Sequence, residues 1–204
     1  MKKILISLFL SLFFIGCLDY TQYVTVDGNK NITVVAIVTM SKSLVELAAS
    51  SEGNENTIPD YYYDDILREM EDEARNNYPR NFKFKKINNE NEIGIYINGV
   101  IKLDDLTEDY SSLVPIKDGN KFIFNAYDYY DIKDDYSEYS SILSSMKMKL
   151  IISKDYIPRI SSCYLSSYDE VKDINVYDLK DSFLIELPMV YGISISRPIL
   201  YIEM

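Results

Sequence analysis

Carboxylates are the side chains through which this chain could most readily do chemistry, because it has 32 of them and no histidine. A glycosidase needs two such acids about 5 to 10 Å apart across a sugar. Among so many acids some pair will meet by chance, and no local motif selects one. The absence of histidine removes Ser-His-Asp and Cys-His nucleophile pairs. We therefore expect no enzyme and no catalytic residues, with a carboxylate-based hydrolase as the minority hypothesis.

Two acidic clusters raise the question of a metal site, because carboxylate oxygens are the ligands that calcium prefers. One cluster contains Asp104, Asp105, Glu108 and Asp109, and the other contains Asp128, Asp131, Asp134 and Asp135. Neither has the regular spacing of a calcium-binding loop. A solvated acidic surface is the simpler interpretation, so we expect neither a metal ion nor a cofactor.

One cysteine has a context that predicts covalent chemistry. Lys2 and Lys3 precede an apolar run, residues 4–15, that ends in Gly16-Cys17. The run is shorter than the roughly 20 apolar residues that span a bilayer, but it has the charged and apolar parts of a secretory signal. The pattern resembles a bacterial lipoprotein signal with a relaxed lipobox, since Phe14 replaces the common leucine. The alternatives are a plain cleaved signal and an uncleaved anchor.

The lipoprotein resemblance implies that residues 1–16 are a signal peptide and that Cys17 is the first mature residue. Its sulfur would carry diacylglycerol, and its amino group an acyl chain such as palmitate. The implied location is the cell envelope, anchored in a membrane and facing the periplasm or the exterior. Several acyl chains hold a protein on a membrane almost permanently, so no other contact with lipid is required.

Composition indicates a folded body over residues 17–204, which we expect to be one domain. The chain is 47% hydrophobic and 26% charged, as in ordinary globular proteins. Its net charge of −11 argues against nucleic acid and against electrostatic docking on anionic lipid. If Cys17 is lipidated, Cys163 has no disulfide partner, and its alternating surroundings predict a buried residue that acts as a small hydrophobe.

The pattern along the chain predicts an α+β fold, in which an antiparallel multi-stranded sheet carries two early helices on one face. Strands 20–26 and 32–40 should form a hairpin, with Asp27-Gly28 in a type I′ turn. A short helix should follow a cap at Ser41 or Ser43. The clearest helix should begin near Pro59 and end before Pro79. Its apolar stripe consists of Tyr63, Ile66, Leu67, Met70 and Ala74.

The rest of the chain is predicted to be mostly strands. They span residues 82–87, 93–103, 113–117, 122–126, 147–153, 159–166, 174–177, 183–187 and 193–201, with a second Asp-Gly-Asn-Lys turn at 118–121. Residues from 134 onwards favour a helix weakly. The repeated tetrapeptide is better explained by repeated turn chemistry than by a duplicated half-domain.

Tyrosine is unusually frequent, at 19 residues, and tryptophan is absent. Its flat amphipathic ring suits carbohydrate or protein partners. Such a face could contain Tyr61, Tyr62 and Tyr63 with Tyr127, Tyr129, Tyr130, Tyr136 and Tyr139. The alternative, which we favour, is a composition biased by AT-rich codons, in which tyrosine on sheet surfaces needs no ligand.

Several features together resemble the bacterial LppM-like lipoproteins. They are Cys17 followed by Tyr20, the Asp27-Gly28 hairpin, the helix start at Ser41, and the Ile157-Pro-Arg-Ile segment. The chain departs from that family in lacking a C-terminal membrane segment and in having a long Tyr/Asp-rich insertion. The resemblance implies an envelope-anchored α+β domain for which recognition of lipid or glycolipid is expected, with no catalytic residues to transfer.

We therefore expect a non-enzymatic lipoprotein with a binding or structural role at the membrane surface, acting on a lipid, glycan or envelope protein partner. The alternative is a carrier that holds a lipid or other apolar ligand between sheet and helices, near Ile66 and Met70. Its cavity would be lined by Ile93, Ile95, Phe122 and Phe124.

Overall fold

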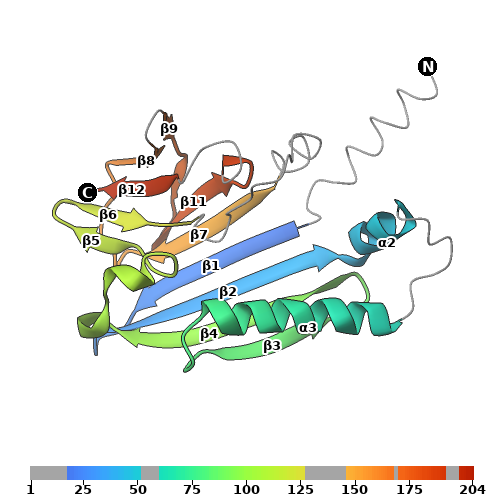
Figure 1. Cartoon of the computed structure of the whole chain (residues 1–204). Coiled ribbons are helices and arrows are strands. Elements are labelled where there is room, and N and C mark those ends of the chain that lie inside the picture. Colours follow the sequence, from blue (N-terminus) through green and yellow to red (C-terminus); the bar gives the residue numbers. More distant parts are fainter. Residues whose placement is uncertain (1–17, 52–59, 127–145, 168–169, 192–197) are drawn as a thin grey trace, which may run out of the picture. The chain divides into compact units, whose positions relative to one another are not determined.

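The computed structural model describes residues 18–51, 60–126, 146–167, 170–191 and 198–204 (Figure 1). Its α-helices are α2 (Lys42–Ser51) and α3 (Asp60–Asn77), and short 3-10 turns are η1 (Leu103–Asp105) and η2 (Glu108–Tyr110). The strands in the first half are β1 (Leu18–Val26), β2 (Asn31–Ser41), β3 (Lys83–Asn88), β4 (Glu92–Lys102), β5 (Ile116–Asp118) and β6 (Lys121–Phe124). Those in the second half are β7 (Lys147–Ser153), β8 (Ser162–Ser166), β9 (Val171–Asp173), β10 (Val176–Asp178), β11 (Ser182–Pro188) and β12 (Ile199–Glu203). The helix predicted from residue 134 lies outside the described residues.

The strands hydrogen-bond in two sheets, so the prediction of an α+β fold is confirmed. The larger sheet has the order β10-β11-β7-β1-β2-β4-β3, and the smaller has the order β5-β6-β12-β8-β9. The strand pairs β3–β4, β7–β11 and β6–β12 are all antiparallel. Alternation along a strand marks its buried face but not the sheet it joins, and for that reason the sequence suggested a single sheet.

The chain divides into two compact units. The first unit contains residues up to Tyr20 together with Ala36–Asn98, and the second contains Thr21–Val35 together with Gly99–Met204. Strands β1, β2 and β4 each contribute residues to both units. The expectation of one domain over residues 17–204 stays a prediction.

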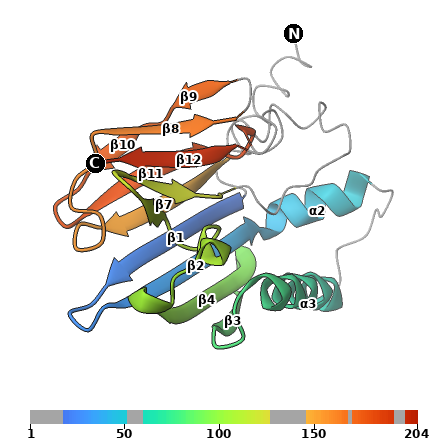
Figure 2. The ribbon, with the colours of Figure 1, turned by 60° about the vertical axis from the view of Figure 1, so that its left-hand side comes forward.

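In the first unit, the helices cover the sheet through the stripe that the sequence predicts. Tyr63 and Leu67 of α3 are buried with Val45 of α2 against Ile93 of β4, and Ile66 packs on the same cluster. In Figure 2, α2 follows the end of β2, and α3 lies beside β3 and β4. Ser41 caps the start of α2, since its hydroxyl oxygen accepts the backbone N–H of Leu44 at 3.2 Å. None of the described helices is long and apolar enough to cross a membrane.

Gly94 lies at a close approach of two strands in the first unit. A Cβ at this position would lie 2.1 Å from the carbonyl oxygen of Val38 and 2.8 Å from the Cα of Thr39. Neither atom can move without shifting β2, because both belong to the backbone. Only glycine fits where β4 passes β2 here.

In the second unit, strict alternation builds the core. The inward positions of β7 and β11 include Leu150, Ile152, Ile185 and Leu187, all with no exposed surface. Gln22 is also fully buried, and its side-chain amide donates to the carbonyl oxygen of Leu113 at 2.6 Å. This bond supplies a partner for a polar group that would be costly to bury alone.

The second unit also contains both Asp-Gly-Asn-Lys turns, and they differ. The N–H of Asp27 donates to the carbonyl of Asn31, so residues 28–30 form a three-residue loop. Lys30 takes the positive φ there, at 62°. In the other hairpin Asp118 pairs with Lys121, and Gly119 takes the positive φ, also 62°. The type I′ turn predicted at Asp27-Gly28 is therefore wrong, because Gly28 does not have a positive φ.

Candidate functional site

The predicted lipidation site, Cys17, lies outside the described residues, but its neighbour does not. β1 begins at Leu18, the residue directly after Cys17. Consecutive Cα atoms are about 3.8 Å apart, so no linker separates the predicted anchor from the sheet. An acyl group on Cys17 would hold the start of β1 close to the bilayer surface.

The first unit has a polar hollow of about 530 Å³, lined by Lys42, Tyr63, Asp64, Asn88, Asn89 and Glu90. The side chain of Asn89 shapes one wall, because its oxygen accepts the backbone N–H groups of Asn91 and Glu92, both at 3.0 Å. The ammonium of Lys42 lies 4.8 Å from the centroid of the Tyr63 ring. The Tyr63 hydroxyl in turn donates to Glu46 at 2.9 Å.

This hollow can hold water or a small polar molecule, but its lining does not suit an acyl chain. Apolar ligands bind in concave sites lined mainly by hydrophobic side chains. Here the lining side chains carry an ammonium, two carboxylates and two amides. The geometry also shows no nucleophile paired with a base, so the hollow does not resemble a catalytic site.

The residues proposed to line an apolar cavity belong to different units. Ile93 is fully buried in the cluster with Tyr63 and Leu67, so side chains occupy the space beside it. Ile66 packs against that cluster from α3. Phe122 and Phe124 are buried in the smaller sheet of the second unit. The carrier hypothesis stays a prediction, and this packing does not favour it.

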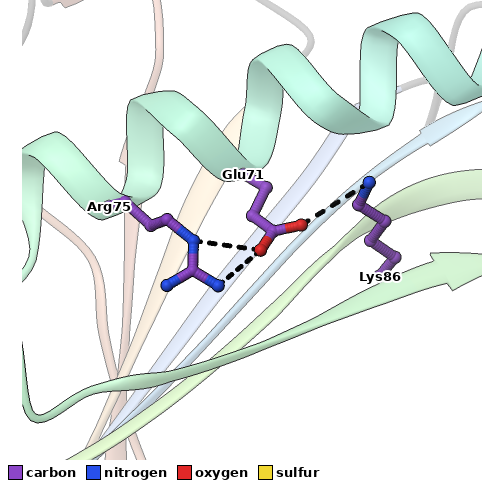
Figure 3. A network of polar contacts seen from close by, with 3 residues as sticks. All are labelled: Glu71, Arg75 and Lys86. Carbon is purple, nitrogen blue, oxygen red and sulfur yellow. Dashed lines mark hydrogen bonds and ion pairs between the residues drawn. The ribbon is translucent and has the colours of Figure 1, made fainter.

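A network of charged groups joins α3 to β3 (Figure 3). An oxygen of Glu71 accepts a hydrogen bond from Nε of Arg75 at 3.0 Å, and its other oxygen lies 3.5 Å from Nζ of Lys86. The hydrogen bond from Arg75 is the main reason why the pKa of Glu71 lies below its usual value. The guanidinium of Arg75 also lies 4.8 Å from the centroid of the Phe84 ring.

The acidic clusters give no metal site within the described residues. Asp104 and Asp105 lie on η1, while Glu108 and Asp109 lie on η2, and all four are exposed. No group of three or more possible ligands comes together anywhere in the part of the chain that the structure describes. The second cluster, residues 128–135, lies outside that part. The expectation that no metal ion binds therefore stays a prediction.

The tyrosines near the start of α3 do not form a platform. Tyr63 is buried and Tyr62 packs against the core cluster, so only Tyr61 is largely exposed, at 66%. Successive helical residues point about 100° apart, and this separates the three rings. The other five tyrosines proposed for this face, residues 127–139, lie outside the described residues.

Sequence reasoning missed a tyrosine pair on the smaller sheet. Tyr164 and Tyr201 are directly opposite on β8 and β12, and their rings stack with centroids 5.4 Å apart. The ammonium of Lys121 lies 4.4 Å from the Tyr201 ring centroid, and the Tyr164 hydroxyl donates to Glu203 at 3.1 Å. The Tyr164 hydroxyl and the Lys121 ammonium thus have partners within the smaller sheet. Strand parity would have identified the pair only together with the β8–β12 register, which the sequence does not provide.

Cys163 lies where the sequence predicts, in the core. Its side chain is 5% exposed, and burial raises the pKa of the thiol to about 12. A thiol with so high a pKa has almost no thiolate at neutral pH and reacts slowly. Its role is therefore packing.

Comparisons with known proteins give one distant structural likeness. No protein-family model matches the chain, and the curated proteins give no match. Among solved structures, the chain is similar to the folded domain of the LppM (Rv2171) protein from Mycobacterium tuberculosis, determined by NMR. The sequences are 8% identical, the TM-score is 0.40, and the match covers 92% of this chain and 90% of that one. A likeness this remote carries no argument about what the chain does.

Proposed function

We propose that this protein is a non-enzymatic envelope lipoprotein, held on a membrane by acyl groups on Cys17, with a binding or structural role at the membrane surface. The main support is the signal-like segment, residues 1–16, that ends at a cysteine directly before the first strand of the fold. Because β1 begins at Leu18, acyl groups on Cys17 would attach the sheet itself to the membrane, with no flexible tail between them.

The chemistry of the two cysteines also supports the proposal. Only Cys17 and Cys163 occur in the chain, and Cys163 is buried with a raised pKa. Cys163 therefore cannot readily react with an acyl donor, and Cys17 is the remaining candidate. Two or three chains at one residue would suffice for stable attachment, because each buried methylene contributes about 0.8 kcal/mol.

The experiment is metabolic labelling of the full-length chain, expressed in a bacterium, with an alkyne fatty acid. Cells would produce the unchanged protein, the Cys17→Ala variant or the Cys163→Ala variant as a matched control. We expect the label and detergent-phase partitioning in the unchanged protein and in Cys163→Ala, and loss of both in Cys17→Ala. Mass spectrometry should find a mature chain that starts at acylated Cys17. A label that survives in Cys17→Ala would refute the proposal.

The binding role has a second test. Crosslinking in intact cells should capture the same envelope partners with the unchanged protein and with Cys163→Ala. The Cys17→Ala variant should lose them, because it is no longer concentrated at the membrane. If Cys17→Ala captures the same partners in the same amounts, partner binding does not depend on the anchor. That result would contradict a role at the membrane surface.

A further inference from the structure

Positive charge gathers at one short stretch of this acidic protein. Five of its 21 basic residues lie between residues 75 and 86, where there is no acid. They are Arg75, Arg80, Lys83, Lys85 and Lys86, and we call them the basic edge. All five are exposed. The net charge of −11 therefore conceals a local region of opposite sign.

The fold places these residues on or beside an edge strand. Among the described strands, β3 is the terminal strand of the larger sheet and pairs with β4 alone. Successive residues on a strand point to opposite faces. Lys86 contacts Glu71 on the α3 side, so Lys83 and Lys85 point to the other side. Positive side chains thus border the edge on both faces.

Part of this charge is unpaired. Glu71 of α3 forms ion pairs with Arg75 and Lys86. In the described part of the chain, no ion pair involves Arg80, Lys83 or Lys85. Lysines on an edge strand discourage pairing with other chains, but that explanation does not cover Arg80, which precedes the strand.

The basic edge also lies near the predicted anchor. The hydroxyl groups of Tyr20 and Tyr78 are 3.4 Å apart, within the first unit. Tyr78 lies between Arg75 and Arg80, and Tyr20 lies three residues after Cys17. Three residues reach at most about 11 Å. With the two tyrosine side chains counted, the predicted anchor lies within roughly 30 Å of the backbone at Tyr78, in the same unit as the charged segment.

We propose that the basic edge binds the anionic lipid headgroups of the bilayer in which Cys17 is anchored, an inference that rests on the proposed function. The acyl chains keep the protein on the membrane, and the basic edge sets which side of the first unit faces it. Charges act on headgroups within a Debye length, about 8 Å in physiological salt, so acids farther away than this are screened. Of the nearby acids, Glu71 pairs with Arg75 and Lys86 and leaves Arg80, Lys83 and Lys85 to face headgroups. Each basic residue near an anionic surface strengthens binding about fivefold.

The test reconstitutes the lipidated full-length protein on two kinds of vesicle, phosphatidylcholine alone and phosphatidylcholine with phosphatidylglycerol. An amine-reactive acetylating reagent then modifies exposed lysines, and mass spectrometry gives the rate at Lys83, Lys85 and Lys86. We expect rates on anionic vesicles at least about threefold lower than on neutral ones, because headgroups cover the side chains. Added salt at about 0.5 M should remove the difference.

Variants make the result specific. In Lys83→Gln/Lys85→Gln, protection of Lys86 by anionic lipid should fall. The matched control Lys117→Gln/Lys180→Gln removes the same charge from other exposed positions and should keep that protection. Circular dichroism checks that both variants fold. Equal rates on both vesicles, or equal loss of protection in both variants, would overturn the inference.

Co-sedimentation separates this inference from the proposed function. If the protein does not sediment with neutral vesicles, the anchor at Cys17 is absent and the proposed function fails. If it sediments with both kinds of vesicle and shows no protection, the anchor stands and the basic edge does not bind headgroups.

Discussion

Asp-Gly-Asn-Lys occurs twice in the second unit, and the two copies close their hairpins with loops of different length. At the first copy Asp27 is opposite Asn31, which leaves three loop residues, and Lys30 has a φ of 62°. At the second copy Asp118 is opposite Lys121, which leaves two, and Gly119 has a φ of 62°. These are the usual geometries of three-residue and two-residue hairpins, respectively.

The flanking strands explain why the first copy takes three residues. Counting back from the Asp27–Asn31 pair places Val24 opposite Val34, and both are fully buried. A two-residue loop would place Val24 opposite Thr33 instead. The buried Val24 and the partly exposed Thr33 would then lie on the same face of the sheet. Burial of the strands therefore selects the register, and the turn residues adapt to it.

The surroundings of the aspartates differ as well. Oδ1 of Asp27 accepts the backbone N–H groups of Asn29 at 2.8 Å and Asn31 at 2.9 Å, and Oδ2 accepts the Asn31 amide at 3.0 Å. Asp118 instead lies 3.8 Å from the ammonium of Lys121. The longer loop thus has a carboxylate that organises its backbone, which allows a lysine to occupy the left-handed region there.

Replacing Gly119 should have the largest effect. In Gly119→Ala, the methyl group meets no atom, but the positive φ disfavours any side chain, so we expect a loss of about 1–2 kcal/mol. Urea unfolding of the full chain measures this loss. A stability equal to that of the unchanged protein would show that the second turn can change its geometry.

The same substitution at the two lysines should have opposite signs. Lys30→Gly relieves a side chain in the left-handed region and should stabilise the fold by about 0.5–1 kcal/mol. Lys121→Gly places glycine at the start of β6 and removes the contact with Tyr201, so a loss of about 0.5–1 kcal/mol is expected. Thermal unfolding of both variants gives the comparison, and shifts of the same sign would contradict it.

Gly28→Ala should change stability less than the substitutions at Gly119, Lys30 and Lys121. Gly28 does not have a positive φ, and nothing lies within 4 Å of a Cβ built there. Alanine also restricts the unfolded chain, so the change should be neutral or stabilising by about 0.5 kcal/mol. Urea unfolding of Gly28→Ala and Gly119→Ala under the same conditions tests this expectation. Similar losses of unfolding free energy in the two variants would mean that the two glycines have equivalent roles.

The smallest effect should be the pH dependence of the first turn. Hydrogen bonds, chiefly from the side chain of Asn31, hold the pKa of Asp27 below its usual value of 3.8. The charged form is therefore favoured in the folded state, and its contribution to stability is lost as pH falls through the lowered pKa. In Asn31→Ala, an NMR titration should show the pKa of Asp27 moving back toward its usual value. An unchanged pKa would contradict the assignment of Asn31 as the main cause.

Sequence reasoning worked where one repeating pattern determines the structure. The stripe containing Tyr63 and Leu67 predicts the buried side of α3, because helical spacing alone decides it. Sequence reasoning failed where the local structure depends on contacts with residues far away in the sequence. The loop at Asp27 depends on cross-strand burial, and the close approach at Gly94 depends on where β2 passes. β9 has only three residues, too few for alternation to be recognised.

The candidate site was harder to predict for a related reason. Lipidation of Cys17 follows from a local motif, so the sequence suffices to propose it. The basic edge depends on Lys83 and Lys85 lying at the end of the sheet order, which no local pattern reveals. Net charge averages over the chain and so argued against contact with anionic lipid, although folding keeps these charges together.

The place of β1 in the larger sheet bears on the order in which the fold can form. β1 lies between β2 and β7, and β7 begins only at Lys147. The second neighbour of β1 thus arrives when most of the chain has been made or translocated. Contacts between distant segments form slowly, so the N-terminal segment stays unpaired on one side for much of that time. If Cys17 is lipidated as we propose, the enzymes that modify it could reach an extended chain at this position before β7 pairs with β1.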